Sequence, residues 1–381
     1  MAENVIKVAG KLQMQIEGGK NITLVRSPNG IWIKMKSDIV DYVMQNYRKP
    51  ASMGKYLPVH DEIIIGKICQ KKNIPLMLKG PTSTGKTHFV EKLADELNVP
   101  IITVPCSEDT SIAHLQGTPA PLSNGGMEIQ FIAGALVLGG ITGALVYLDE
   151  VYEVPNDVLV SIHPIADDRR LFEIRDTGQC FTADPNFMLT GSYNPGKKYQ
   201  DPSKALKPST ALRFVSIYID HPKGEFANAI SAIKFGVKYV YDASNNIYRP
   251  IEDVENEIMN KAKAKEKEAD ERKIALAKDD EATHKLKARI SYLVEKIVEE
   301  IRGGIADHER GMPGTFLEEA CLRIKNFALS LIYEGIPPVR AIEVALANTL
   351  SDEKSKQEAI VQKARDVGSA KEWGVEPDWK S

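Results

Sequence analysis

Residues 80–87 of the chain read Gly80-Pro81-Thr82-Ser83-Thr84-Gly85-Lys86-Thr87. The run fits the pattern G-x-x-x-x-G-K-[ST], in which two glycines allow a tight turn whose backbone N–H groups surround anionic oxygens. In this pattern the lysine adds a positive charge for the β- and γ-phosphates, and the final hydroxyl is a ligand for Mg²⁺. The run therefore predicts a phosphate loop, and we expect the residues from Gly80 to His88 to contact ATP.

The flanking sequence is what a phosphate loop requires. Residues 74–78, Ile-Pro-Leu-Met-Leu, read as a short buried strand before the loop. After the loop, Phe89, Leu93 and Leu97 recur every fourth residue, which is the spacing of a helical stripe. The positive end of that helix dipole would face the phosphates. Strand, loop and helix together favour a nucleoside triphosphate site over a simple glycine-rich turn.

Composition limits the classes of protein to which the chain can belong. The chain has 381 residues, of which 43% are hydrophobic and 27% charged, as in an ordinary globular protein of two or three domains. A formal net charge of −3 indicates no overall nucleic-acid surface, although a local basic pore stays possible. The four cysteines contain no C-x-x-C pair, so neither zinc nor a disulfide framework is predicted. We expect a cytoplasmic protein, since no basic segment followed by an apolar run marks a signal peptide.

One stretch has the length of a membrane span. Residues 131–148 contain no charged side chain over 18 positions, which is the lower limit for a transmembrane helix. Four glycines interrupt the stretch. A buried helix, a glycine turn and a fully buried strand explain it better, so we predict no membrane span.

The chain divides into four predicted parts. Residues 1–52 alternate in the strand period and read as a small β-meander followed by a helix. Residues 53–222 alternate strands and helices, which is typical of an α/β core with a parallel sheet of five strands. Residues 223–285 are dense in charged residues and read as a solvated helical insertion or linker. Residues 286–381 resume an apolar helical stripe and are predicted to form an α-helical lid with a polar tail.

The five strands are predicted at residues 74–78, 101–104, 144–148, 187–190 and 215–219. Two hairpins interrupt the α/β core, with turn signals at Asn124-Gly125 and Asp176-Thr177-Gly178.

Further polar residues follow the predicted strands. Asp149 and Glu150 end the strand at 144–148, where Asp149 can position Mg²⁺ and Glu150 can act as general base on a water. Asn194 follows the fourth strand and is predicted to sense the γ-phosphate, although an Asn-Pro-Gly turn would read the same way. Arg213 precedes the fifth strand, where an arginine could reach the site of a neighbouring subunit. Arg340 opens a lid helix, where the helix dipole disfavours a cation, so we expect it to reach the nucleotide.

The order of these motifs resembles that of the AAA+ ATPases. Stretches such as Leu78-Lys79-Gly80-Pro81-Thr82, Tyr147-Leu148-Asp149-Glu150-Val151 and Ser192-Tyr193-Asn194-Pro195-Gly196 are similar to the CbbQ/NirQ/NorQ branch of the MoxR group. The resemblance covers residues 56–222 strongly and 286–350 weakly. It implies a homo-oligomeric ring, usually a hexamer, with ATP between subunits. It also implies a von Willebrand A-domain partner and a client protein, often a metalloenzyme.

Two other functions stay open from the sequence. A nucleic-acid motor would need Lys or Arg on the pore-facing hairpins, and residues 107–128 contain neither. A nucleotide-gated scaffold without turnover would need no general base, which Glu150 argues against. We therefore expect an ATPase that remodels a partner protein.

Overall fold

The computed structural model describes residues 11–15, 21–26, 32–34, 56–58, 60–121, 129–174, 179–195, 206–309 and 321–374. The chain forms two compact units. One comprises residues 1–50 and 94–192, and the other comprises residues 51–93 and 193–381.

The α/β core contains the predicted parallel sheet of five strands. Its strand order is β12-β4-β11-β8-β5, and the strands are β4 (Leu76–Lys79), β5 (Ile101–Pro105), β8 (Leu145–Asp149), β11 (Met188–Tyr193) and β12 (Val215–Tyr218). Every residue of β4 and β11 is buried, as expected for parallel strands covered on both faces. Strand β4 accordingly begins with a continuous apolar run, Leu76-Met77-Leu78, instead of an alternation, and the predicted fold class is confirmed.

In the first unit, the charge-free stretch at 131–148 begins with the end of a strand and continues as the predicted helix, glycine turn and buried strand. Helix α5 (Ala135–Thr142) is buried along nearly its whole length and ends at Gly143, whose φ of +73° suits glycine. Strand β8 follows directly, as the glycine pattern predicted. Among the described residues no helix has the length and apolarity to cross a membrane. Other elements of this unit are α4 (Ile112–Gln116), the 3₁₀ turn Val151–Glu153, α6 (Asn156–Ser161) and the predicted hairpin β9 (Leu171–Ile174)–β10 (Gln179–Thr182).

A second sheet in this unit joins the N-terminal meander to the first hairpin. The meander strands are β1 (Lys11–Gln15), β2 (Asn21–Arg26) and β3 (Trp32–Lys34), and the hairpin strands are β6 (Gly117–Pro121) and β7 (Ile129–Ala133). Strand β1 pairs with β7 in parallel, placing Met14 opposite Phe131. The order β3-β2-β1-β7-β6 thus makes one sheet from segments about 100 residues apart. The helix expected before residue 52 and the Asn124-Gly125 tip lie outside the described residues.

The second unit holds the phosphate loop, most of the helix that follows it, and the predicted lid. The core helices are α2 (Glu62–Lys71), α3 (Lys86–Glu96) and α7 (Pro208–Ala211). The lid comprises α10 (Glu281–Glu309), α11 (Leu322–Tyr333), α12 (Pro338–Ile342), a π-helix (Glu343–Ala347), α13 (Asn348–Leu350), α14 (Lys354–Val367) and α15 (Ala370–Trp373). The α10 stripe from Ile290 to Ile301 is fully buried, as its spacing predicted. Trp373 is buried within this chain, whereas Trp379 lies outside the described residues.

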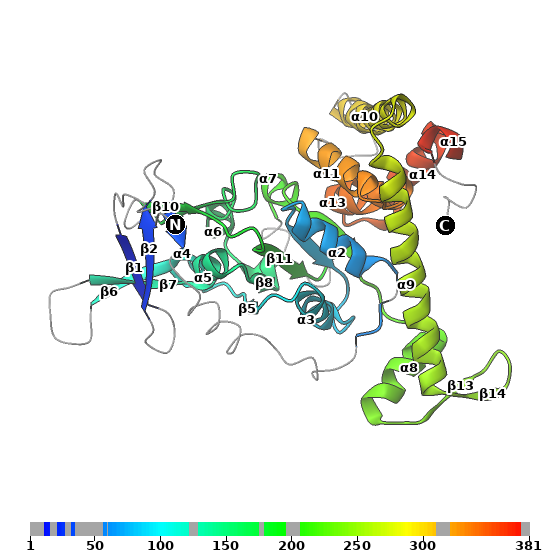
Figure 1. Ribbon diagram of the computed structural model, residues 1–381, viewed down its shortest axis with the longest axis horizontal. Helices are drawn as coiled ribbons and strands as arrows, with labels where there is room; N and C mark the ends of the chain where they lie inside the picture. The colour runs from blue at the N-terminus through cyan, green and yellow to red at the C-terminus, as the bar shows by residue number, and fades with distance from the viewer. Residues whose placement is uncertain are drawn as a thin grey trace, which may run out of the picture. The chain divides into compact units, whose positions relative to one another are not determined.

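Residues 224–276 form an appended module that the sequence reading resolved only in part. It contains α8 (Gly224–Phe235), the hairpin β13 (Tyr239–Asp242)–β14 (Ile247–Pro250) and the long helix α9 (Ile251–Leu276). The charged helix was expected, whereas α8 and the hairpin were not. Figure 1 shows α8 and the hairpin at the N-terminal end of α9. A small core of Ala229, Ala232, Val240 and Val254, together with Leu57, holds these elements together.

Polar contacts fix α9 to its own unit. Glu334, at the C-terminal end of α11, forms ion pairs with three lysines: Lys71 (2.9 Å), Lys72 (2.8 Å) and Lys273 of α9 (3.0 Å). Arg272 of α9 donates a hydrogen bond to the carbonyl oxygen of Gly335 at 2.7 Å. These contacts hold α2, α9 and α11 together despite the mostly exposed surface of α9.

Candidate active site

The backbone of the phosphate loop has the conformation that its glycines allow. Gly80 has φ of +155° and Gly85 has φ of +93°, both outside the range that most side chains tolerate. A Cβ atom at Gly80 would lie 2.0 Å from the carbonyl oxygen of Ile219, so a side chain cannot be placed there. Ser83 also has a positive φ of 65°. Strain of this kind clusters at ligand sites, which agrees with the predicted role of the loop.

Lys86 is the most highly connected side chain that the structure describes in the loop. Its ammonium group is buried and donates hydrogen bonds to the carbonyl oxygens of Gly80 (2.9 Å) and Pro81 (2.8 Å). It also donates to Oδ1 of Asn194 at 2.7 Å. The structure thus brings together two residues that the sequence proposed separately, the loop lysine and the sensor asparagine.

Two further loop residues have local roles. Thr84 is buried and its hydroxyl donates to the carbonyl oxygen of Pro81 at 3.0 Å, which supports the turn. Thr87 is half-buried in the first turn of α3, and His88 beside it is exposed. Backbone N–H groups at the start of α3 are suited to bind phosphate, and the hydroxyl of Thr87 is an oxygen ligand of the kind that Mg²⁺ takes.

Asp149 belongs to the first unit, and two hydroxyl groups donate hydrogen bonds to its carboxylate. Its Oδ1 accepts hydrogen bonds from the hydroxyls of Tyr147 and Ser192, both at 2.7 Å. These two hydroxyl oxygens lie 2.9 Å apart. The sequence reading missed both residues. The signal was available for Tyr147, because a buried tyrosine two positions before Asp149 needs a polar partner for its hydroxyl.

Glu150 adopts a left-handed backbone conformation directly after β8. Its φ and ψ are 58° and 48°, which costs a non-glycine residue about 1–2 kcal/mol. Its N–H group donates a hydrogen bond to Oγ of Ser192 at 3.4 Å. Ser192 therefore contacts both acids of the Asp149-Glu150 pair and fixes the turn that follows the strand.

Cys106 lies next to this turn but is not suited to act as a nucleophile. Its N–H group donates a hydrogen bond to the carbonyl oxygen of Asp149 at 2.9 Å. Burial, followed by the charges of Asp149 and Glu150, raises the pKa of the Cys106 thiol to about 12. The thiol therefore stays protonated at neutral pH.

The two arginines proposed from the sequence have contacts within the second unit. Arg213 follows α7 and donates a hydrogen bond to the carbonyl oxygen of Ser209. Arg340 forms ion pairs with Asp61 (3.0 Å) and Glu343 (2.9 Å). Burial opposes the charge on Arg340, but the two carboxylates outweigh burial and raise its pKa above the usual value. The sequence predicted neither acidic partner, and the expected nucleotide roles of both arginines stay predictions.

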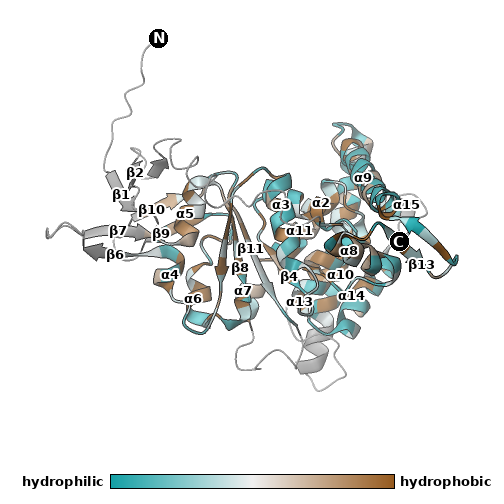
Figure 2. Cartoon of the chain, turned by 90° about the horizontal axis from the view of Figure 1, so that it is seen from below, coloured by the Kyte–Doolittle hydropathy of each residue, from teal (hydrophilic) through white to brown (hydrophobic). Residues whose placement is uncertain are grey.

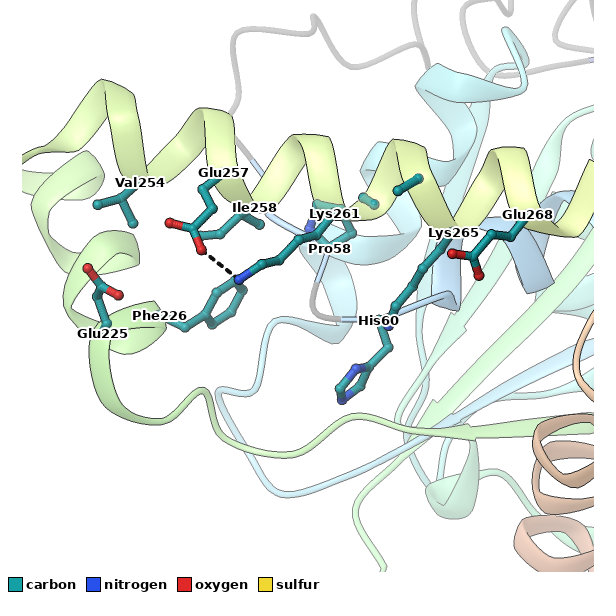
Figure 3. Close-up of a pocket in the computed structure, with 12 residues that line it drawn as sticks. Pro58, His60, Glu225, Phe226, Val254, Glu257, Ile258, Lys261, Lys265 and Glu268 are labelled. Carbon is teal, nitrogen blue, oxygen red and sulfur yellow. Dashed lines mark hydrogen bonds and ion pairs between the residues drawn. The ribbon is translucent and has the colours of Figure 1, made fainter. Parts of the chain in front are cut away.

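A separate groove of about 500 Å³ lies between the appended module and the segment before α2. Figure 3 shows Phe226, Val254 and Ile258 on one part of its wall, with His60 and Lys265 farther along. Lys261 forms an ion pair with Glu257 at 2.6 Å across one α9 turn. Basic and acidic side chains are mixed along the groove, and no phosphate-loop residue lines it. Its chemistry is therefore unlike that of an anion site.

No group of three or more His, Cys, Asp or Glu side chains within the described ranges could hold a metal ion.

Comparison with known proteins agrees with this geometry. Residues 75–214 match the model of the AAA domain (dynein-related subfamily). NorQ of Paracoccus denitrificans is 45% identical over 168 residues, covering 44% of this chain and 60% of NorQ. CbbQ of Hydrogenophilus thermoluteolus is 33% identical over 306 residues, covering 80% of this chain and 91% of CbbQ.

The denitrification regulatory protein NirQ of Stutzerimonas stutzeri is 41% identical over 167 residues, covering 44% of this chain and 59% of NirQ. The chain thus matches about three fifths of the length of NorQ and NirQ. A crystal structure from Cytophaga hutchinsonii shares the fold, with a TM-score of 0.50 at 15% identity over 87% of this chain and 93% of that one.

The match to CbbQ extends from the α/β core into the helical part of the chain, and the described core carries the strained phosphate loop with Lys86 bound to Asn194. The chain therefore belongs to the family of AAA+ ATPases that includes NorQ, NirQ and CbbQ.

Proposed function

We propose that this protein hydrolyses ATP and uses the hydrolysis cycle to remodel or activate a partner protein. The observation that carries the proposal is the position of Lys86, which is bound to the loop carbonyls and to Asn194. A buried ammonium group between a glycine loop and a polar side chain is suited to the β- and γ-phosphates of ATP.

We assign the catalytic roles by the chemistry of each group. Glu150 acts as general base on the attacking water, and Asn194 orients that water beside the γ-phosphate. Asp149 ends β8 and Glu150 follows it, Asn194 follows β11, and the loop follows β4. Polar groups at the carboxyl ends of parallel strands are the usual components of one ligand site.

Mg²⁺ fits the available donor set. A carboxylate at Asp149 and a hydroxyl at Thr87 are hard oxygen ligands of the kind that Mg²⁺ prefers, and these two residues would hold it. When bound, Mg²⁺ would neutralise charge on the phosphates. Tyr147 and Ser192 keep Asp149 oriented by their hydrogen bonds to its Oδ1.

We place the active assembly in a homo-oligomeric ring, a hexamer on the pattern of the MoxR group, in the cytoplasm. Arg213 then serves as the cation that reaches the ATP of the next subunit, and Arg340 couples the lid to the nucleotide. Since Arg340 already pairs with Asp61 and Glu343, its nucleotide role requires an exchange of partners.

The appended module offers a surface for a protein partner. Within the described residues, seven of the twelve exposed large apolar side chains fall between residues 230 and 248. They include Phe235 (76% exposed) and Tyr248 (74% exposed), and Figure 2 shows brown segments on the hairpin that starts with β13. Such patches commonly mark interaction sites. A von Willebrand A-domain adaptor and a client protein such as a metalloenzyme are the partners that the family resemblance suggests.

Turnover by the purified full chain tests the proposal. We expect ATP hydrolysis that Glu150→Gln reduces by about 100-fold while ATP binding persists, because loss of a general base removes catalysis and not affinity. Glu153→Gln, three residues farther in the 3₁₀ turn, is the matched control and should keep wild-type turnover. Wild-type hydrolysis by Glu150→Gln would contradict the mechanism. A Glu150→Gln trap loaded with ATP is also the form with which to capture the partner.

A further inference from the structure

A carboxylate of the lid is hydrogen-bonded to two residues of the α/β core. Oδ1 of Asp352, just after α13, accepts a hydrogen bond from Nζ of Lys79 at 2.8 Å. The same oxygen accepts one from the hydroxyl of Tyr193, also at 2.8 Å. Nζ of Lys79 lies 5.4 Å from the centre of the Tyr193 ring, so the three side chains form one cluster.

The two core residues of this cluster directly precede the two residues that bind Lys86. Lys79 is followed by Gly80, whose carbonyl oxygen accepts from Lys86 at 2.9 Å. Tyr193 is followed by Asn194, whose Oδ1 accepts from Lys86 at 2.7 Å. Asp352 is therefore linked to the ammonium group of Lys86 twice, once through Lys79 and Gly80 and once through Tyr193 and Asn194.

Helix α13, which precedes Asp352, also makes hydrogen bonds to the α/β core. Nζ of Lys79 also donates to the carbonyl oxygen of Asn348. The side chain of Asn348 donates to the carbonyl oxygen of Ser216 at 3.1 Å, and the hydroxyl of Thr349 donates to that of Phe214 at 3.2 Å. These residues follow a π-helical turn, Glu343–Ala347, a feature that is frequent at functional sites.

Burial makes the charge on Lys79 costly. The Lys79 side chain is 4% exposed, so its ammonium group is removed from water, whereas the Asp352 side chain is 31% exposed and stays partly hydrated. An apolar side chain in the place of Lys79 would avoid the desolvation of a charge. The polar cluster instead fixes the direction of two backbone segments, each one residue away from a ligand of Lys86.

We propose that Asp352 is a positioning residue for ATP hydrolysis. Through Lys79 and Tyr193 it keeps Gly80 and Asn194 in the register that places Lys86 and the sensor amide against the γ-phosphate. The inference rests on the proposed ATPase function and adds a lid residue to it. Because the three side chains act on Lys86 through Gly80 and Asn194, their loss should lower the rate of the chemical step and leave ATP binding almost intact.

Conservative substitutions in the full chain test this proposal. Tyr193→Phe removes one hydroxyl and keeps the ring, and Asp352→Asn removes the charge and keeps the shape. Tyr333→Phe is the matched control, since its hydroxyl donates to the carbonyl oxygen of Lys287 within the lid. Asp366→Asn is the second control, because this exposed carboxylate of α14 binds only Gln362 among the contacts that the structure describes for it. For each variant the measurements are kcat and KM for ATP, the Kd values for ATP and ADP, and the melting temperature.

We expect kcat to fall about tenfold in Tyr193→Phe and in Asp352→Asn, which corresponds to loss of one or two hydrogen bonds in the transition state. The Kd for ATP should change by less than about threefold, and both controls should match the wild type. The double variant should be no slower than Asp352→Asn, because both changes break the same cluster. Unchanged kcat with only a lower melting temperature would overturn the proposal, as would independent, multiplicative losses in the double variant.

A wild-type protein that does not hydrolyse ATP would give a different result from a wrong role of Asp352. If the wild type binds ATP without turnover, the proposed enzymatic function fails, and the ratio of the Kd values for ADP and for a non-hydrolysable ATP analogue becomes the readout for Asp352. The cluster then predicts that Asp352→Asn shifts this ratio by about twofold, since only the ATP analogue presents a γ-phosphate to Lys86 and Asn194. An unchanged ratio would overturn the role of Asp352 in that case.

Discussion

Nζ of Lys86 lies 2.7 Å from Oδ1 of Asn194, although 108 residues separate the two in sequence. The lysine belongs to the phosphate loop, and the asparagine follows the last residue of β11. A phosphate that binds to Lys86 therefore meets the side-chain amide of Asn194 at the same place.

This pair predicts different effects for its two members. Lys86→Met should raise the Kd for ATP by about tenfold or more, because it removes the only charge of the loop. Asn194→Ala should lower kcat by about 10- to 100-fold and change the Kd for ATP by less than about threefold, because it misplaces the attacking water. Titration with a fluorescent ATP analogue and a phosphate-release assay measure the two quantities. Asn245→Ala, in the β13–β14 turn, is the control, and equal losses of affinity in all three variants would contradict these roles.

The hydrogen bonds to Asp149 predict an effect on metal dependence. Ser192→Ala removes one donor to Oδ1 of Asp149 and the acceptor of the Glu150 N–H group. We expect the Mg²⁺ concentration for half-maximal turnover to rise about tenfold, which is the usual effect of losing a hydrogen bond to a metal ligand. Ser161→Ala is the matched control, because this serine is also buried in the same unit and donates only to the carbonyl oxygen of Val158 among its described contacts. An unchanged Mg²⁺ requirement in Ser192→Ala would show that the serine has no part in metal binding.

Gly335 predicts a stability effect that depends on the contact between the lid and α9. Its φ is +102°, and a Cβ atom there would lie 1.9 Å from the carbonyl oxygen of Ala269. Gly335→Ala should therefore lower the free energy of unfolding by about 3 kcal/mol or more, through backbone strain and displacement of α9. Gly236 has φ of +67° but has open space around its Cβ position, so Gly236→Ala should cost only about 1 kcal/mol. Chemical denaturation measures both values, and equal costs would mean that the close approach at Gly335 is relieved without penalty.

The lysines around Glu334 predict loss of stability in acid. Burial alone would raise the pKa of Glu334, but hydrogen bonds from Lys72, Lys71 and Lys273 outweigh burial and lower it from 4.5 to about 2. A carboxyl group whose pKa is lower in the folded state stabilises the fold fully above its unfolded pKa, and this contribution disappears as the pH falls through the folded pKa. The stabilisation should therefore be complete above about pH 4.5 and lost by about pH 2.

Glu334→Gln tests this interpretation. The wild type should exceed the variant in unfolding free energy by on the order of 1–2 kcal/mol near neutral pH, with the partial exposure of the lysines limiting the effect. The difference should shrink as the pH is lowered from 4.5 to 2. Glu358→Gln, on the exposed face of α14, should show no such trend. A difference between wild type and Glu334→Gln that stays constant over this range would exclude the proposed ion-pair contribution.

Local sequence patterns determined the elements of the fold. The continuous apolar runs predicted the five parallel strands, and the fourth-residue stripe predicted α10, because burial on two faces or on one helical face leaves a direct record in residue order. The glycines at 134–143 separated α5 from β8 for the same reason. Glycine and lysine at fixed spacing likewise located the phosphate loop, since its chemistry requires those residue types next to one another.

The tertiary structure alone decided which distant residues meet. The pairing of β1 with β7, the cluster of Asp352 with Lys79 and Tyr193, and the hydroxyls around Asp149 join residues that no local period connects. Helix α8 and the hairpin β13–β14 were also not predicted from the sequence, and the small core that they share includes Leu57, which is far from them along the chain. A hydrogen bond depends on two atoms being close in space, whereas a sequence pattern reports only on neighbours along the chain. The sequence of this protein therefore specified the phosphate loop, and the fold specified what holds Lys86 and its ligands in place.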